Sequence, residues 1–186
     1  AAEHGAHVIS MSLGGPSSSE ALVDAIKVAN EKDVLVVAAM GNNGREVESY
    51  PAAIPGVMAI GATDSKDKKA SFSQFGKWIS VTAPGVGILS TFPTYASGMP
   101  GKDYGSISGT SMATPQVAGL AGLVRSQFPD LKAGEVRAKI EGSADDFGTA
   151  GFDKYFGYGR VNVFKALSPS QSLQAQNFHR FGYRGR

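Results

Sequence analysis

The residue type best placed for chemistry in this sequence is the serine at position 111, within the run G-T-S-M-A-T-P at residues 109–115. A serine that follows a glycine turn and opens a helix presents its hydroxyl at the helix N-terminus. Free N–H groups and the positive end of the helix dipole stabilise negative charge that develops there. Ser111 is therefore a candidate for a reaction in which negative charge develops at its hydroxyl. The alternative is that Ser111 or Thr110 only caps the helix.

Asn42 is the second candidate, in the run A-A-M-G-N-N-G at residues 38–44, directly after an apolar segment. In α/β folds ligands bind beyond the carboxyl ends of the strands, which is where Asn42 is expected. Its amide can donate a hydrogen bond to a developing oxyanion. The alternative is turn chemistry, because asparagine and glycine both favour left-handed turn conformations.

A third segment, S-L-G-G at residues 12–15, follows another predicted strand. Its backbone could pair with an extended peptide that adds to the strand. Taken alone the segment is weak evidence for peptide binding, since any strand can end in two glycines.

The elements that must position these residues alternate between short apolar runs and amphipathic ones, which is typical of an α/β fold. Strands are predicted at residues 7–13, 34–39 and 57–62, and a helix between the first two makes a right-handed βαβ unit. Ser17 and Glu20 form a capping box that would open this helix. Its apolar face holds Leu22, Ala25, Ile26 and Ala29.

Shorter extended segments are predicted at residues 70–75, 78–83 and 87–91, followed by a Gly/Pro-rich loop over residues 92–105. The long helix after Gly109 carries apolar residues on all sides, so we expect it to be buried. Pro115 is expected near the end of its first turn, where a missing N–H costs least. Gly119 and Gly122 each cost about 1 kcal/mol in a helix, and close backbone packing is the expected compensation. A surface helix is predicted at residues 132–140.

Composition excludes several classes of protein. The 186 residues are 42% hydrophobic, which suits one domain with a core, and the 24 glycines have no collagen period. Without cysteine there is no disulfide scaffold, thiolate zinc site or cysteine nucleophile. A net charge of +2 argues against nucleic acid as a partner. No apolar run approaches the roughly 18 residues that span a membrane, so no membrane partner is expected either.

Seven ordered blocks of the sequence resemble the subtilisin-like serine protease family. They are V-I-S-M-S-L-G-G, V-V-A-A-M-G-N-N-G, Y-P-A-A-I-P-G-V-M-A-I-G-A, F-S-Q-F-G, A-P-G-V, G-T-S-M-A-T-P-Q-V-A-G and G-Y-G-R-V-N. The resemblance runs from about residue 6 to residue 167. It implies a three-layer α/β fold in which helices flank a mainly parallel central sheet. Residues 1–167 would be the C-terminal portion of the peptidase domain, and residues 168–186 a basic polar tail or linker.

The resemblance also assigns roles to individual residues. It implies that Ser111 is the nucleophile of a serine endopeptidase, and that Asn42 and the Ser111 N–H hold the oxyanion. The substrate would be a polypeptide. The residues that the resemblance assigns to substrate binding are one wall at Ser12, Leu13 and Gly14, the facing wall at Ala39, Met40 and Gly41, and a floor near Ser49.

No cofactor takes part in the implied chemistry. A structural calcium ion is compatible with the resemblance, since some relatives bind a cation through backbone carbonyls at the positions of Ala52, Ile54 and Val57. Tyr50-Pro51 matches a dipeptide that is often cis in the family.

Glu48 lies close to the implied cavity, and we hypothesise that it favours a basic residue before the scissile bond. A solvated loop charge is the alternative.

The family's triad runs Asp, His, Ser along the chain. Its first two segments should precede residue 7, so the resemblance implies that the N-terminal portion of the domain is missing. That portion is then the expected partner, and the chain alone is expected to be inactive. The run H-G-A-H-V at residues 4–8 resembles the family's histidine motif, but it leads into a strand instead of a helix. We therefore do not expect His4 or His7 to be catalytic, and no third ligand indicates a metal site.

Two other functions stay open. An α/β-hydrolase could use Ser111 with Asp145 or Asp146 and His179, in the order Ser, Asp, His. A truncated half-domain could only bind peptide or associate with another chain. The basic run F-H-R-F-G-Y-R-G-R in the tail could touch nucleic acid, although short basic tails are commonly just solvated. Family habit and the absence of cysteine indicate an extracellular, secreted protein.

Overall fold

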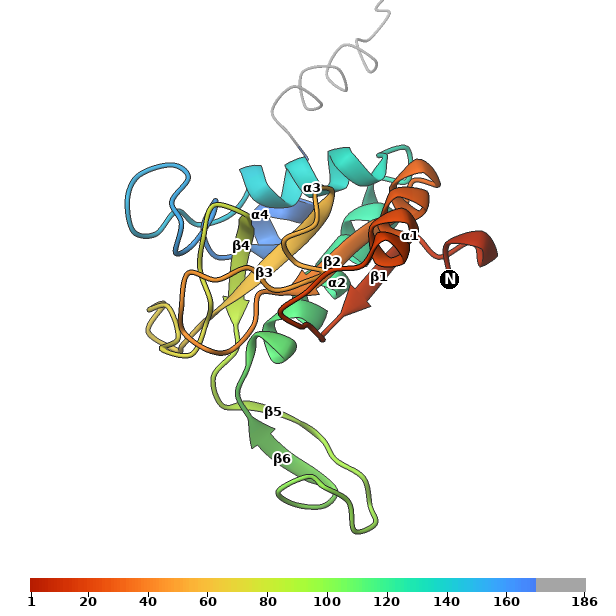
Figure 1. Ribbon diagram of the computed structural model, residues 1–186. Helices are drawn as coiled ribbons and strands as arrows, with labels where there is room; N and C mark the ends of the chain where they lie inside the picture. Colours follow the sequence, from red (N-terminus) through yellow and green to blue (C-terminus); the bar gives the residue numbers. More distant parts are fainter. Residues whose placement is uncertain (170–186) are drawn as a thin grey trace, which may run out of the picture.

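A parallel four-stranded sheet forms the centre of the structure, a computed structural model that describes residues 1–169 (Figure 1). Its strands are β1 (Val8–Met11), β2 (Leu35–Ala39), β3 (Val57–Thr63) and β4 (Ile79–Pro84), and they lie side by side in chain order. Every residue of β2 and β3 is buried, as expected of parallel strands that are covered on both faces. The three strands predicted first are confirmed, and the segment predicted at 78–83 becomes β4.

Helices cover both faces of this sheet. The helix α1 (Glu20–Glu31) packs on one face, and α2 (Thr110–Gln127), α3 (Ala133–Gly142) and α4 (Val163–Leu167) pack on the other. Successive side chains of a strand point to opposite faces, so Val36 and Ala38 join the core under α1 while Val37 joins the core under α2. The predicted three-layer α/β architecture is confirmed. A short 3-10 helix (Ala2–His4) precedes β1.

A two-stranded antiparallel hairpin projects from this body (Figure 1). Its strands are β5 (Ile88–Thr91) and β6 (Tyr104–Ile107). The sequence predicted β5 but assigned the start of β6 to a loop, because Y-G-S-I is too short and too polar to indicate a strand. The extended segment predicted at 70–75 is wrong: Ser71 and Phe72 form a turn, and residues 73–75 belong to no strand.

Two predictions about the helices are also wrong. The residue that caps α1 is Ser19, whose hydroxyl accepts from the Leu22 N–H at 3.2 Å, and the helix begins at Glu20. Helix α2 is buried on one side only. Its buried residues include Val117, Leu120 and Val124, whereas Leu123 on the other side is 50% exposed.

The two glycines of α2 lie on that exposed side, and a Cβ added at Gly119 or Gly122 would have no neighbour within 4 Å. The close packing predicted for them is therefore not made by residues 1–169.

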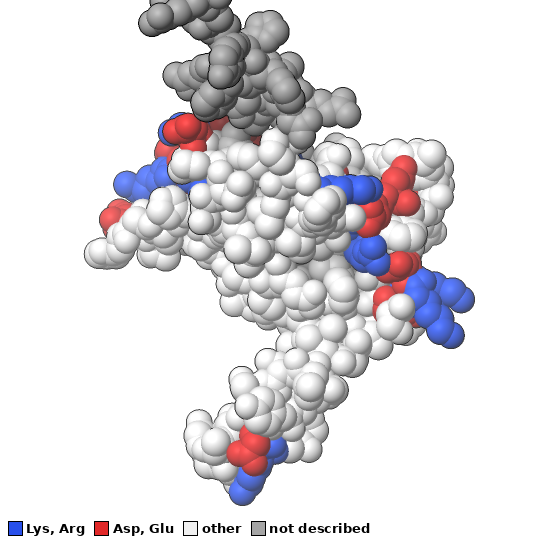
Figure 2. All heavy atoms as spheres, turned by 180° about the vertical axis from the view of Figure 1, so that it is seen from behind, with Lys and Arg blue, Asp and Glu red and all other residues white. Residues whose placement is uncertain are grey.

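Seen from behind, the molecule carries a broad area without charged atoms between two groups of charged side chains (Figure 2).

The two edges of the sheet differ. The outer edge of β4 is covered by residues 157–161: the Thr82 N–H donates to the Gly159 carbonyl at 2.8 Å, and the Val161 N–H donates to the Thr82 carbonyl at 2.9 Å. On the opposite edge, β1 pairs with β2 and with no other strand of the described chain. None of the described helices is long and apolar enough to cross a membrane.

Candidate active site

Ser111 is the second residue of α2, directly beyond the carboxyl end of β1 in space. Two reciprocal hydrogen bonds join them: the Ser111 hydroxyl donates to the Ser12 carbonyl at 3.3 Å, and the Ser12 hydroxyl donates to the Ser111 carbonyl at 2.8 Å. Pro115 is the reason that the Ser111 carbonyl is available. It lies in the second turn of α2, later than predicted, and has no N–H for the carbonyl four residues earlier.

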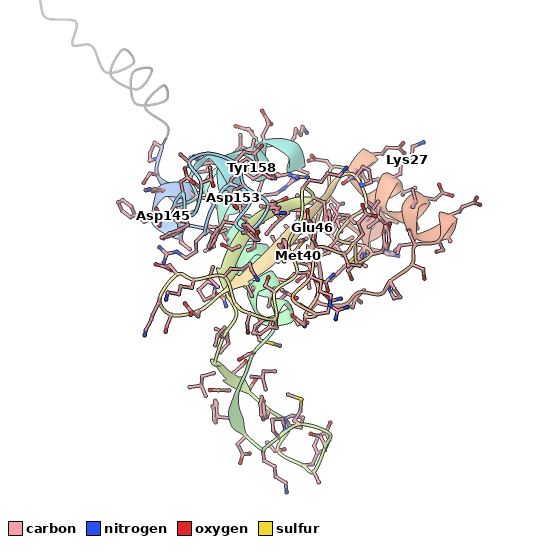
Figure 3. The ribbon with its side chains drawn as sticks, turned by 60° about the vertical axis from the view of Figure 1, so that its left-hand side comes forward. Lys27, Met40, Glu46, Asp145, Asp153 and Tyr158 are labelled. Atoms are coloured by element: carbon pink, nitrogen blue, oxygen red, sulfur yellow. The ribbon has the colours of Figure 1, made fainter. Side chains whose placement is uncertain are left out.

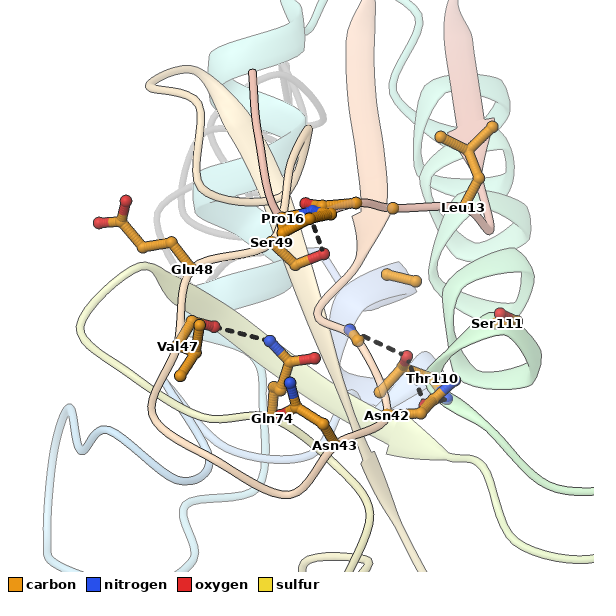
Figure 4. A pocket seen from close by; sticks show the side chains of 14 residues that line it. Leu13, Pro16, Asn42, Asn43, Val47, Glu48, Ser49, Gln74, Thr110 and Ser111 are labelled. Carbon is orange, nitrogen blue, oxygen red and sulfur yellow. Dashed lines mark hydrogen bonds between the residues drawn. The ribbon is translucent and has the colours of Figure 1, made fainter.

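Asn42 follows β2 and faces the start of α2 (Figure 4). Its side-chain oxygen Oδ1 accepts from the Thr110 N–H and from the Thr110 hydroxyl, each at 2.9 Å. The Thr110 oxygen in turn accepts from the Gly41 N–H at 3.2 Å. Because Thr110 supplies two donors, the amide oxygen must face it, and the amide nitrogen Nδ2 points away. Within residues 1–169 Nδ2 makes no hydrogen bond, so it is free to donate to a ligand.

Gly109 separates the two free donors. A Cβ added there would lie 3.5 Å from Asn42 Nδ2 and 3.6 Å from the Ser111 nitrogen. The Ser111 N–H, like Nδ2, has no acceptor in the described part of the chain. The backbone of Gly109 is extended, with φ 161°, so a side chain is compatible with its conformation. The glycine instead keeps open a small space that two N–H donors border, beside the Ser111 hydroxyl.

A cavity of about 300 Å³ adjoins this space (Figure 4). Ser111 and Asn42 line it, together with five of the residues assigned to substrate binding: Leu13, Gly14, Ala39, Gly41 and Ser49. Ser12 does not line the cavity and contacts Ser111 instead. The structure thus brings three segments that are far apart in the sequence to one cavity, and it adds Gln74, which the sequence analysis missed.

Comparisons with known proteins decide the family. A model described as "Subtilase family" matches residues 1–159. This chain belongs to the subtilase family. Thermitase from Thermoactinomyces vulgaris is 46% identical over 167 residues, and the match covers 90% of this chain and 56% of thermitase. Subtilisin Savinase from Lederbergia lenta is 43% identical, with coverage of 88% and 57%.

Solved structures agree with this fold. A lanthipeptide protease superposes with a TM-score of 0.81 at 28% identity, covering 89% of this chain and 62% of that protein. A psychrophilic subtilisin-like protease from Pseudoalteromonas sp. AS-11 superposes with a TM-score of 0.80 at 24% identity, covering 89% and 70%. The chain spans a little over half the length of the curated subtilases described above.

One residue assigned to the cavity of this subtilase chain does not line it. Met40 is fully buried, and its side chain packs into the core under α1 with residues such as Ile54 (Figure 3). The physical reason is alternation along an extended segment: Ala39 and Gly41 border the cavity, so the side chain between them points the other way. The prediction that Met40 forms part of the wall is wrong for its side chain.

Glu48 borders the cavity, but its carboxylate points away from it (Figure 4). The Tyr50 hydroxyl donates to Glu48 Oε2 at 2.6 Å, and this bond raises the pKa of Tyr50 above its usual value. The geometry therefore does not support the hypothesis that Glu48 selects a basic side chain. The Tyr50-Pro51 bond is cis, as expected.

The histidines of the described chain are remote from the nucleophile. His7 precedes β1, at the opposite end of the strand from Ser12, and five residues of extended chain span roughly 16 Å. It lies beside Gly122 and Arg125 in the C-terminal half of α2. His4 belongs to the short helix before it. Neither can take a proton from Ser111 in this arrangement, and His179 lies outside the described residues.

Asp145, one of the two aspartates of the hydrolase alternative, is already bound by other side chains. Asp145 accepts from Lys165 Nζ at 2.7 Å and from Arg160 Nη2 at 2.8 Å, and the Asn162 amide also donates to it. These partners, Lys165 first, lower the pKa of Asp145 to about 2. Asp145 lies beside α4, and its ion pairs join the C-terminal segment to the body of the domain (Figure 3).

Two of the three carbonyls proposed for a cation already accept hydrogen bonds from the protein. The Val57 carbonyl accepts from Arg137 Nη1 at 3.3 Å, and the Ile54 carbonyl accepts from the Val57 N–H at 3.1 Å. A guanidinium on one of three oxygens repels a second cation, so this set does not fit a divalent ion. The described residues also contain no cluster of three or more His, Cys, Asp or Glu side chains that could hold a metal.

Proposed function

We propose that this chain supplies the nucleophile and the oxyanion hole of a serine endopeptidase that hydrolyses polypeptides. The observation that carries the proposal is the pair of free donors on either side of Gly109, Asn42 Nδ2 and the Ser111 N–H, next to the Ser111 hydroxyl. Preorganised donors of this kind stabilise the negative charge of a tetrahedral intermediate. Membership of the subtilase family supports the same role.

In the proposed reaction an extended substrate pairs with the backbone of Ser12 to Gly14, and the side chain before the scissile bond enters the cavity. The Ser111 oxygen attacks the carbonyl carbon and transfers its proton to a general base. Asn42 and the Ser111 N–H hold the oxyanion. The base then returns the proton to the leaving amine, and water hydrolyses the acyl-enzyme by the same steps in reverse. No cofactor takes part.

The general base is proposed to come from a preceding segment of the same domain. Two uncovered surfaces meet near Ser111: the free edge of β1 and the exposed side of α2, where Leu123 is half exposed. A segment that covered both would bring its residues close to the nucleophile. Without it, the Ser111 hydroxyl donates to the Ser12 carbonyl, and no group of residues 1–169 is placed to take its proton. The chain alone is therefore proposed to be inactive.

Activity of the chain joined to the preceding segment of its reading frame tests the proposal. We expect hydrolysis of a peptide substrate that Ser111→Ala abolishes. In subtilisin, a relative of this chain, loss of the oxyanion asparagine lowers kcat by about 10²–10³. We expect Asn42→Leu to do the same here with KM little changed, and Gly109→Ala to lower kcat without lowering the melting temperature. Full activity of either variant would contradict the oxyanion hole.

A non-catalytic half-domain that binds peptide or another chain is the second candidate. The remoteness of His4 and His7 from Ser111 favours it. Binding of a peptide by the joined protein, with no hydrolysis above that of Ser111→Ala, would establish this alternative. An extracellular location is proposed on family habit. It is tested by detecting the protein in the culture medium.

A further inference from the structure

Gln74 closes the inner end of the cavity and is the polar side chain there that no assigned role uses. It is 4% exposed and lies in the irregular segment after the turn at Ser71 and Phe72, far from Ser111 in the sequence. Its backbone N–H donates to the Gly41 carbonyl at 3.0 Å, and its side-chain Nε2 donates to the Val47 carbonyl at 2.6 Å. Gln74 thus joins the wall at Gly41, through its backbone, to the segment at Val47, through its side chain.

The orientation of the Gln74 amide follows from these contacts. The Val47 carbonyl accepts hydrogen bonds and cannot donate one, so the group that faces it must be the nitrogen. The amide oxygen Oε1 then points inward to the cavity, beside Gly41 (Figure 4). A Cβ at residue 41 would overlap Oε1, so the glycine there makes room for it.

No donor within the described chain bonds Oε1. Gln74 is nearly buried as a residue, but its Oε1 atom is accessible and unpaired within the described chain. Oε1 is also open to the cavity, where a ligand could supply the donor. The glutamine is therefore held in place by one wall and presents an acceptor to whatever fills the cavity.

The chemistry of the other lining groups restricts the ligand. Glu48 is the one ionisable residue of the lining, and its carboxylate is bonded to Tyr50 and points outward. The interior is therefore neutral, and desolvating an ammonium or guanidinium group there would be unfavourable. A neutral hydroxyl donor at the end of an apolar side chain suits such a cavity.

We infer that Gln74 is a specificity-determining residue that accepts a hydrogen bond from the hydroxyl of a tyrosine placed before the scissile bond, and thereby favours tyrosine over phenylalanine. This inference rests on the proposed function, because it assumes that a substrate side chain enters the cavity. It assigns to Gln74 a contact that distinguishes two substrates differing by one oxygen atom. A site built around such a contact discriminates against the analogue that leaves its polar group unpaired.

Peptide binding to the 186-residue chain tests the inference without requiring catalysis. The probes are acetylated Ala-Ala-Ala-Tyr and Ala-Ala-Ala-Phe with free C-terminal carboxylates, titrated by NMR. A carboxylate can occupy the space between the two oxyanion donors. We expect the tyrosine peptide to bind about fivefold more tightly, the contribution of one neutral hydrogen bond. In Gln74→Met, which keeps a similar volume but loses the acceptor, the two peptides should bind equally.

A matched control separates Gln74 from the other polar group of the floor. Ser49→Ala removes a hydroxyl from the same cavity and should leave the preference for tyrosine unchanged. If Gln74 only anchored the Val47 loop, Gln74→Met would weaken both peptides by the same factor and keep their ratio. That result, or a preference that Ser49→Ala erases, would overturn the inference.

A peptide ending in O-methyltyrosine covers the case in which Gln74→Met does not fold. Its ether oxygen cannot donate, so it should bind the unmodified chain no more tightly than the phenylalanine peptide does. Equal binding of tyrosine and phenylalanine peptides overturns the inference and leaves the proposed function standing. Failure of both peptides to bind contradicts the proposed function itself.

Discussion

The two edge strands of the central sheet differ in how far their outer backbone groups are hydrogen-bonded. Along β4, residues 157–161 supply backbone hydrogen bonds, and Arg160 joins Asp67 and Asp145 in ion pairs that fasten this segment. Along β1, no described residue pairs with the outer backbone, and the neighbouring side of α2 exposes Leu123 and two glycines. Ser111 lies beside this uncovered edge, beyond the carboxyl end of β1. Backbone hydrogen bonds and ion pairs close the sheet on the β4 side. The β1 side is uncovered, and the proposed general base is expected there.

The largest expected effect belongs to the covered edge. Gly159 has φ +119°, and a Cβ there would overlap the Asp145 carbonyl. We expect Gly159→Ala to lower the free energy of unfolding by about 3 kcal/mol or more, since backbone strain and a backbone overlap combine. Urea denaturation measures this. An unchanged midpoint would mean that residues 157–161 do not hold the β4 edge in the closed form seen here.

Asp145 gives a smaller effect with a defined pH dependence. Its pKa in the folded protein is about 2, below the ordinary value of 3.8. The stabilisation is therefore fully present above about pH 4 and is lost as the pH falls toward about 2. After allowance for partial exposure, we expect Asp145→Asn to destabilise the protein by about 1 kcal/mol at pH 7.

The same difference should shrink to a small fraction by pH 2, because the Asp145 carboxyl is then about half protonated in the folded protein and almost fully protonated in the unfolded one. Denaturation midpoints across this range check the expectation. A difference that stays constant from pH 7 to pH 2 would show that the ion pairs with Arg160 and Lys165 contribute nothing through the charge of Asp145.

The smallest effect, with the opposite sign, is expected on the open side. Gly119 is helical and a Cβ there meets nothing. Gly119→Ala should therefore stabilise this chain by about 0.5–1 kcal/mol, the difference in helix propensity. In the protein joined to its preceding segment, the gain should vanish if that segment packs closely on α2. An equal gain in both forms would leave the α2 surface without a partner.

Local patterns in the sequence predicted much of the fold and the chemical centre. The apolar runs of β2 and β3 and the order of strands and helices follow from residue type along the chain. Asn42 stands out because it directly follows Gly41 at the end of β2, and Ser111 because it lies two residues after Gly109 at the start of α2. The helix face predicted for α1 is partly right, since Ile26 and Ala29 are its buried residues.

Features that depend on distant residues were not predicted. The role of Thr110 in orienting Asn42 requires knowing that residues 68 positions apart meet. The inward position of Gln74 depends on its bond to Val47, which nothing in the run F-S-Q-F-G indicates. The exposure of one side of α2 was not predicted for a related reason. An apolar helix predicts burial, but the sequence of the helix does not show which other elements pack against each of its sides.

Proteolysis by the purified 186-residue chain tests most directly whether the open side leaves the site incomplete. A peptide substrate is incubated with the unmodified chain and with Ser111→Ala at the same high concentration, and both folded states are verified by circular dichroism. We expect no difference between the two rates, because no base among residues 1–169 lies within reach of the Ser111 hydroxyl. Hydrolysis by the unmodified chain that Ser111→Ala abolishes would show that the base is already present, and would contradict the need for a preceding segment.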